Sequence, residues 1–208
     1  MVSVILQLKF PGYPVNSIGF TLPVLILVLK ISDFEIDVDD LTLLYNRNWL
    51  YKNYKKIETL FNSSTITLTN PTYLIFMDID HLDDLNRTYG RETGNQVLLQ
   101  ITDILNEVSS EFESRSSIIP IRYGGDEFML ICSLESAKDI ASLINLIKVK
   151  VRKLSDTKIN GFVFSLSFGY TEINFENSNI IDDIAAADLD MYREKKNKRY
   201  KNNKQFTF

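Results

Sequence analysis

Four acidic side chains follow or border apolar runs in two short segments of this 208-residue chain. The segment "YLIFMDID" ends in Asp78 and Asp80, and the segment "RYGGDEF" carries Asp126 and Glu127 directly after two glycines. An apolar run that ends in acids is typical of a buried strand, and a Gly-Gly pair between apolar runs favours a tight hairpin. If these strands are neighbours, the carboxylates of Asp78, Asp126 and Glu127 converge at one edge of a sheet.

Carboxylates held close together resist common ionisation unless a cation neutralises them. Mg²⁺ is the natural occupant because it prefers oxygen ligands and takes one or two protein carboxylates, which leaves positions for phosphate oxygens. The neighbouring Gly124 and Gly125 would let a phosphate approach the backbone. An exposed hairpin with acids beside its turn explains the same spacing, and strand alternation would point Asp126 and Glu127 to opposite faces. Asp126 is therefore the first choice of ligand.

A basic segment near the end of the chain supplies the opposite charge. Lys195 and Arg199 are four residues apart in a predicted helix, so they project from the same helical face. Six of the ten residues 195–204 are Lys or Arg. Such cations suit a triphosphate, Arg through its planar fork and Lys as a point charge. The alternative is a solvated helix end, which the charge pattern alone favours.

The composition limits the classes of protein and site. Hydrophobic residues make up 45% and charged residues 24% of the chain, as in an ordinary globular domain. The net charge of -4 gives no bias toward nucleic acid, and none is expected as a partner. Cys132 is the only cysteine and His81 the only histidine, which excludes an intramolecular disulfide and an ordinary Cys/His zinc site. A metal must therefore be held by oxygen, and a cytoplasmic, reducing location fits best.

The first part of the chain differs from the rest, because residues 10–29 carry no charge. Twenty uncharged residues are enough to span a bilayer, but Pro11, Pro14 and Pro23 interrupt the run. Residues 1–38 are accordingly interpreted as an apolar segment, either a packing arm or a membrane-associated remnant that acts through residues 10–31 at the inner face of the membrane. The main domain is predicted to occupy residues 39–208.

The remaining patterns predict helices alternating with strands. Apolar residues at helical spacing follow residue 39, and again at 92–108 and 136–151. Strands are expected at 73–80, on both sides of Gly124 and Gly125, and at 161–173, before a last helix that runs into the basic segment. This order indicates an α+β fold with helices packed on one sheet.

Five segments together resemble the signature blocks of the GGDEF family, the diguanylate cyclases, over about 160 residues. They are "DDLTLLYNR" (39–47), "DIDHLDDLNRTYGRETGNQVL" (78–98), "RYGGDEF" (122–128), "SFG" (167–169) and "ADLDMYREKKNKR" (187–199). The resemblance implies a central five-stranded, mainly antiparallel sheet flanked by helices, similar to the palm of nucleotidyl cyclases. It also implies a bacterial second-messenger enzyme that condenses two GTP into cyclic di-GMP, releases two pyrophosphates, and works as a homodimer with Mg²⁺ or Mn²⁺.

The same resemblance assigns a role to particular residues. Asp78, the carbonyl of Ile79 and Asp126 would bind the metal, and Asp126 and Glu127 would be the catalytic acids. The substrate would contact seven residues: Asn86, Arg91, Asn95, Gly124, Gly125, Lys195 and Arg199.

The second block departs from the family pattern at several positions. Phe-Lys, Asn-Asp, Gly-His and Gly-Asp of the family are here Leu82-Asp83, Asn86-Arg87, Gly90-Arg91 and Gly94-Asn95. An aspartate at position 95 would accept two hydrogen bonds from guanine, whereas Asn95 offers one acceptor and an NH₂ group. One hypothesis is relaxed purine selectivity, and the alternative is that neighbouring groups still select guanine.

Two further expectations follow from the resemblance. The Arg-x-x-Asp site of product inhibition is incomplete, because Arg115 is followed by Ile118 in place of the Asp; feedback by cyclic di-GMP should be weak or absent. The departures from the pattern also leave open a catalytically silent module that binds GTP or a protein partner. A third alternative is a fragment of a longer sensor protein.

Overall fold

The computed structural model describes residues 23–25, 37–62, 70–112, 117–158, 164–177 and 179–205. The chain divides into two compact units, Met1–Ile36 and Asp37–Phe208. In the first unit, residues 23–25 form a short helical turn, and the rest of the predicted apolar segment 10–31 lies outside the described residues. Within the described ranges, no helix is long and apolar enough to cross a membrane.

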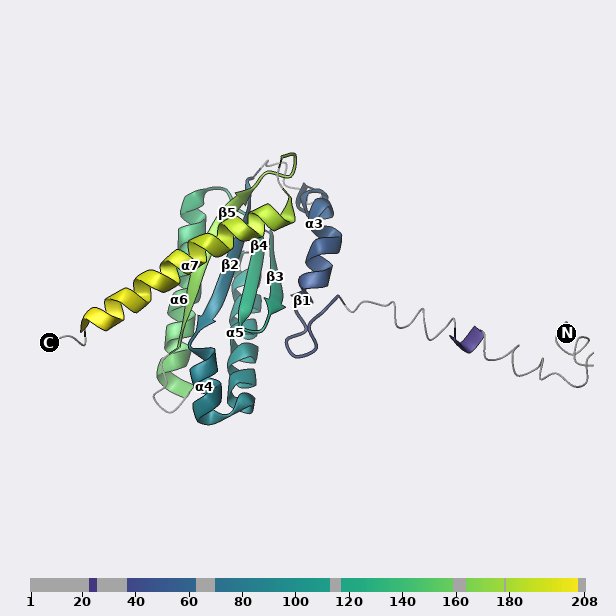
Figure 1. Cartoon of the computed structure of the whole chain (residues 1–208). Coiled ribbons are helices and arrows are strands. Elements are labelled where there is room, and N and C mark those ends of the chain that lie inside the picture. Colours follow the sequence, from purple (N-terminus) through teal and green to yellow (C-terminus); the bar gives the residue numbers. More distant parts are fainter. Residues whose placement is uncertain are drawn as a thin grey trace, which may run out of the picture. The chain divides into compact units, whose positions relative to one another are not determined.

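The second unit is built on a five-stranded mixed sheet (Figure 1). Its order is β1-β3-β4-β2-β5; β1 runs parallel to β3 and every other pair is antiparallel. The predicted α+β fold with a mainly antiparallel five-stranded sheet is thus confirmed. The strands are β1 (Tyr45–Asn46), β2 (Thr72–Asp80), β3 (Ser117–Gly124), β4 (Glu127–Ser133) and β5 (Ser165–Ile173).

Among the described residues of this unit, five helices pack around the sheet (Figure 1). They are α3 (Arg47–Asn62), α4 (Leu82–Tyr89), α5 (Arg91–Phe112), α6 (Ala137–Lys158) and α7 (Ile180–Gln205). Alternate residues of β2 enter separate cores because successive side chains of a strand point to opposite faces. Ile75 and Met77 pack with α4, α5 and α6, whereas Leu74 and Phe76 pack with α3 and α7.

This alternation decides where the acids of β2 lie. Asp78 and Asp80 continue the series of Leu74 and Phe76, so they belong to the face that carries α3 and α7. Glu127 continues the series of Met129 in β4 and belongs to the same face. The acids of two neighbouring strands therefore share one side of the sheet.

Two features of the helices were not predicted. Residues 82–89 form a separate helix, α4, which follows His81 at a φ of 66° and ends at Gly90 at a φ of 88°. The first helix of this unit begins at Arg47, because the side chain of Asn46 accepts a hydrogen bond from the Trp49 N–H at 3.1 Å. Leu44 is buried but precedes that helix.

The hairpin between β3 and β4 differs in detail from the expected Gly-Gly turn. Gly124 is the last residue of β3 and pairs with Glu127, so the two turn residues are Gly125 and Asp126. Gly125 alone of the pair has a positive φ, 51°. Asp126 thus occupies the turn itself, where strand alternation does not fix the direction of its side chain.

Helix α7 lies directly against β5 at Gly169. A Cβ atom at this position would lie 2.1 Å from the carbonyl oxygen of Ala187 and 2.1 Å from the backbone nitrogen of Met191. Only glycine permits such an approach of two backbones. The basic end of α7 is thereby held over the strand ends that carry the acids.

Candidate active site

The structure brings Asp78, Asp126 and Glu127 together at one end of the sheet. Asp78 of β2 is the cross-strand partner of Glu127 in β4. The backbone N–H of Ile79 donates a hydrogen bond to the carbonyl oxygen of Asp126 at 3.2 Å. The hairpin turn therefore rests on the end of β2.

The charges of this cluster affect each other. Burial raises the pKa of Asp78, Lys195 opposes that rise, and the negative charge of Asp126 adds to it, so the pKa is above its usual value. Burial also raises the pKa of Glu127, and the carboxylates of Asp126, Asp78 and Asp188 raise it further. Such mutual repulsion is the condition in which a cation binds favourably.

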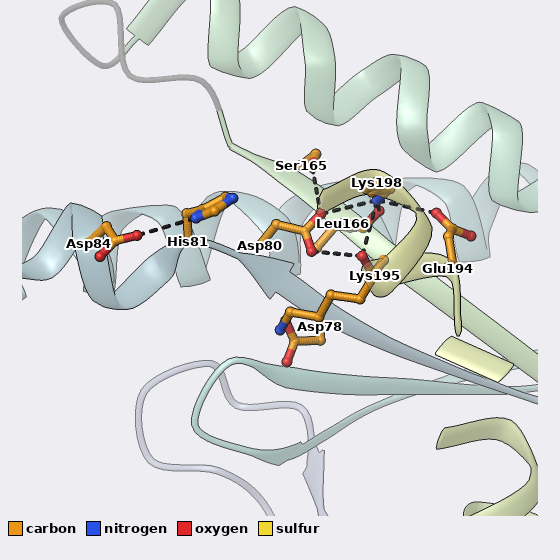
Figure 2. Close-up of polar contacts among 10 residues, drawn as sticks. Asp78, Asp80, His81, Asp84, Ser165, Leu166, Glu194, Lys195 and Lys198 are labelled. Carbon is orange, nitrogen blue, oxygen red and sulfur yellow. Dashed lines mark hydrogen bonds and ion pairs between the residues drawn. The ribbon is translucent and has the colours of Figure 1, made fainter. Parts of the chain in front are cut away.

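A lysine ammonium occupies the position of that cation at Asp78. Nζ of Lys195, from α7, lies 2.5 Å from Oδ1 of Asp78 (Figure 2). Both side chains are largely shielded from water, with 22% of the lysine and 10% of the aspartate exposed. Lys195 thus neutralises the buried carboxylate of Asp78.

The oxygen donors at this point fit Mg²⁺. Within the described part of the chain, no group of three or more His, Cys, Asp or Glu side chains is arranged to hold a metal. A Mg²⁺ ion does not need such a group, because it commonly binds one or two carboxylates and takes its other ligands from phosphate and water. Asp78 and Asp126, with the carbonyl of Ile79, provide a donor set of that kind.

The hairpin that carries Asp126 is held by Arg122. This arginine donates to the carbonyl oxygen of Gly125 at 2.8 Å and to Oδ1 of Asp39 at 2.8 Å. Asp39 also accepts hydrogen bonds from the N–H and the hydroxyl of Thr42. Burial alone would raise the pKa of Asp39, but Arg122 and Thr42 outweigh it and hold the pKa below its usual value. The first and third signature blocks are therefore one structural unit.

Asn86 and Asn95 lie on either side of the turn between α4 and α5. Oδ1 of Asn86 is buried and has no hydrogen-bond partner. Gly94 leaves room for this side chain, since a Cβ there would lie 1.9 Å from that oxygen. An unpaired buried acceptor is costly, so it favours a ligand that brings an N–H group. Asn95 is half-buried near the start of α5.

The other predicted site residues divide into two groups. Arg91 is exposed at the start of α5, and Gly124 is exposed at the end of β3. The side chain of Arg199 and the whole of Arg115 lie outside the described residues. Ile118 pairs with Cys132 and packs partly against the core, so the position that would complete the inhibitory motif faces apolar surroundings.

Several residues near the acids were not predicted as site residues. Asp80 is buried beside Asp78 and contacts Lys198 and two serines of β5 (Figure 2). Asp188 of α7 contributes to the raised pKa of Glu127. Two spacings in the sequence could have predicted this arrangement. Asp78 and Asp80 are two residues apart in a strand, and Lys195 and Lys198 are three residues apart in a helix.

The sequence is similar to those of known proteins. The sequence model described as diguanylate cyclase, GGDEF domain, matches residues 36–201. Diguanylate cyclase DgcP of Escherichia coli is 30% identical over 164 residues, which are 77% of this chain and 45% of that protein. Diguanylate cyclase A of Treponema denticola is 28% identical over 130 residues, 61% of this chain and 33% of that protein. The chain thus spans less than half of these curated relatives.

Solved structures show the same fold. The coiled coil and GGDEF domain of DgcB from Caulobacter crescentus, in complex with c-di-GMP, aligns with a TM-score of 0.65 at 22% identity. That alignment covers 92% of this chain and 95% of the other. The GGDEF domain of DgcB alone aligns with a TM-score of 0.61 at 25% identity, over 78% of this chain and 92% of the other.

Proposed function

Since this chain belongs to the GGDEF family of diguanylate cyclases, we propose that it condenses two molecules of GTP into cyclic di-GMP and two pyrophosphates. In each half of the reaction, the 3'-oxygen of one GTP forms a bond to the α-phosphorus of the other. The bond from that phosphorus to pyrophosphate breaks, and the hydroxyl proton passes to a base. Each domain holds one GTP, so two copies of the chain must face each other.

The residues at the strand ends support this assignment. Asp78, Asp126 and the carbonyl of Ile79 would hold Mg²⁺ or Mn²⁺, which when bound offsets the negative charge that develops during phosphoryl transfer. Asp126, in the turn, would accept the proton of the attacking hydroxyl. Glu127 lies beside it and adds negative charge that favours the metal. Lys195 would exchange Asp78 for a phosphate oxygen when the metal binds.

One observation carries the proposal. Nζ of Lys195 lies 2.5 Å from a carboxylate that is almost fully buried next to two further acids. A core ion pair alone does not need those additional repelling acids, because each adds to the cost of the buried charge. A site that binds a divalent cation with a triphosphate needs both the acids and the lysine.

Turnover of GTP tests the proposal. Purified protein with GTP and Mg²⁺ should form cyclic di-GMP, identified by mass spectrometry, and Asp126→Ala should abolish product formation. The exposed Lys196→Met is a matched control outside the cluster and should retain activity. Binding of GTP without turnover, unchanged in Asp126→Ala, would instead support the alternative of a silent regulatory module. The exposed Asp83 and Arg87, which depart from the family pattern, favour that alternative.

The purine base is expected to be guanine. The unpaired Oδ1 of Asn86 can accept a hydrogen bond from the 2-amino group of guanine, which adenine lacks. Asn95 weakens the selection by offering one acceptor where an aspartate would offer two, a loss of about 1–3 kcal/mol. Incubation with GTP and ATP together should give cyclic di-GMP as the main product. A large fraction of mixed product would show relaxed selectivity, and its loss in Asn95→Asp would identify Asn95 as the cause.

A further inference from the structure

Asp80 is a buried carboxylate with three hydrogen-bond partners at this end of the sheet. It is 5% exposed, and it accepts hydrogen bonds from Oγ of Ser165 at 2.5 Å and Oγ of Ser167 at 2.7 Å. Nζ of Lys198 is 3.0 Å from its Oδ2 (Figure 2). A buried charge with this many partners is anchored in place.

Lys198 is equally well occupied. Besides Asp80, its ammonium contacts the carbonyl oxygen of Leu166 at 2.5 Å and Oγ of Ser167 at 3.1 Å. Glu194, one turn earlier in α7, lies 3.2 Å away. An ammonium has three donors, so these contacts leave none for a phosphate. Lys198 is therefore unsuited to bind substrate, although it lies in the basic segment.

The two ion pairs run side by side between α7 and β2. Asp78 and Asp80 are two residues apart in the strand, so their side chains point to the same face. Lys195 and Lys198 are about one helical turn apart, so they lie on the same side of α7. A shift of α7 by one residue would rotate its side chains by about 100° and carry Lys195 away from the acids. Whatever fixes the register of α7 at Asp80 therefore also fixes Lys195 at Asp78.

We propose that Asp80 and Lys198 form a clamp that positions Lys195 for the metal and the triphosphate, without either residue touching them. This inference rests on the proposed function, and it assigns different roles to two adjacent and chemically similar ion pairs. The Asp80–Lys198 pair stays closed throughout. The Asp78–Lys195 pair opens when the metal and GTP bind.

The decisive experiment is a double-mutant cycle on GTP binding. The affinity for GTP with Ca²⁺, a cation chosen to limit turnover, is measured for Lys198→Met, Lys195→Met and the double variant. Lys198→Met should weaken binding about tenfold, a change of about 1.4 kcal/mol. In the Lys195→Met background it should have little further effect, because the clamp acts through Lys195. Equal losses in both backgrounds would overturn the proposal and indicate that Lys198 contacts the ligand itself.

Two measurements keep the test independent of enzyme activity and of folding defects. Amide hydrogen exchange in α7 around residues 190–198 should accelerate in Lys198→Met and in Ser165→Ala/Ser167→Ala, and remain near wild type in the exposed control Lys196→Met. Lys198→Arg should restore part of the protection. Unchanged exchange in the first two variants would refute the clamp. Absence of GTP binding in the wild-type protein would count against the proposed function, while the exchange result would still decide the clamp.

Discussion

Removal of the Lys195 ammonium should leave Asp78 as a buried charge without a counter-ion. Asp78 is 7% exposed and its pKa is already raised by burial and by neighbouring acids. Breaking a fully buried ion pair by removing one partner costs about 3–5 kcal/mol. Because 22% of the Lys195 side chain is exposed, water can partly replace it. The loss in Lys195→Met should therefore be smaller, about 2 kcal/mol of unfolding free energy.

Thermal unfolding in the presence of EDTA measures this loss. For a chain of this size, about 2 kcal/mol corresponds to a Tm lowered by about 4–8 °C. Lys196→Met is the matched control, because Lys196 is exposed on the same helix. The difference between Lys195→Met and wild type should shrink as the pH falls through the raised pKa of Asp78, since the protonated carboxyl needs no counter-ion.

Addition of Mg²⁺ should reverse part of the effect. In the variant the ion meets a free carboxylate, whereas in the wild type it must displace the lysine, so Mg²⁺ should raise the Tm more in Lys195→Met than in wild type. Two results would refute this reasoning. One is a Tm of Lys195→Met equal to that of Lys196→Met in EDTA, and the other is an equal response of all three proteins to Mg²⁺.

Three other predictions concern the scaffold of the site. Gly169→Ala should lower the Tm strongly, because its Cβ would overlap the backbone of α7, whereas Gly124→Ala has no atom within 4 Å of the added group and should leave the Tm near wild type; equal effects would contradict the close approach. Arg122→Met should cost about 2 kcal/mol at neutral pH by denaturant unfolding. The difference should shrink as the pH falls through the depressed pKa of Asp39, since protonation removes the ion pair in the wild type while the hydrogen bond from Arg122 to Gly125 remains. A difference independent of pH would exclude the ion pair as its cause. Cys132 should react with a thiol reagent only after unfolding, because burial raises the pKa of its thiol, and rapid reaction of the folded protein would show that the strand is accessible.

The order of most elements could be predicted because their patterns are long and regular. The run "YLIFMDID" is apolar on both faces and forms the interior strand β2, which helices cover on both sides. Helix α4 was missed because its eight residues are mostly polar, with only Leu82 and Leu85 buried. Strand β1 was missed because two residues are too few to show an alternation of apolar and polar side chains. Its pairing with β3 also depends on tertiary contacts.

The candidate site was predicted in part for a similar reason. The meeting of Asp78 with the hairpin acids follows once the two strands are neighbours, and alternation places Glu127 on the same face. The sequence could not show that Asp126 lies in the turn, because this depends on which glycine takes the positive φ. The sequence also could not show that Lys195 and Lys198 have different roles, because this difference depends on the serines of β5 that surround Asp80.

The most direct test of the central claim is the position of a divalent cation at the strand ends. Crystals grown with Mn²⁺ and a non-hydrolysable analogue of GTP would give an anomalous difference peak for the metal. We expect that peak within coordination distance of the carboxylates of both Asp78 and Asp126, with Lys195 moved from Asp78 to a phosphate oxygen. A bound nucleotide with its metal away from these two carboxylates, or with Lys195 still paired to Asp78, would contradict the account.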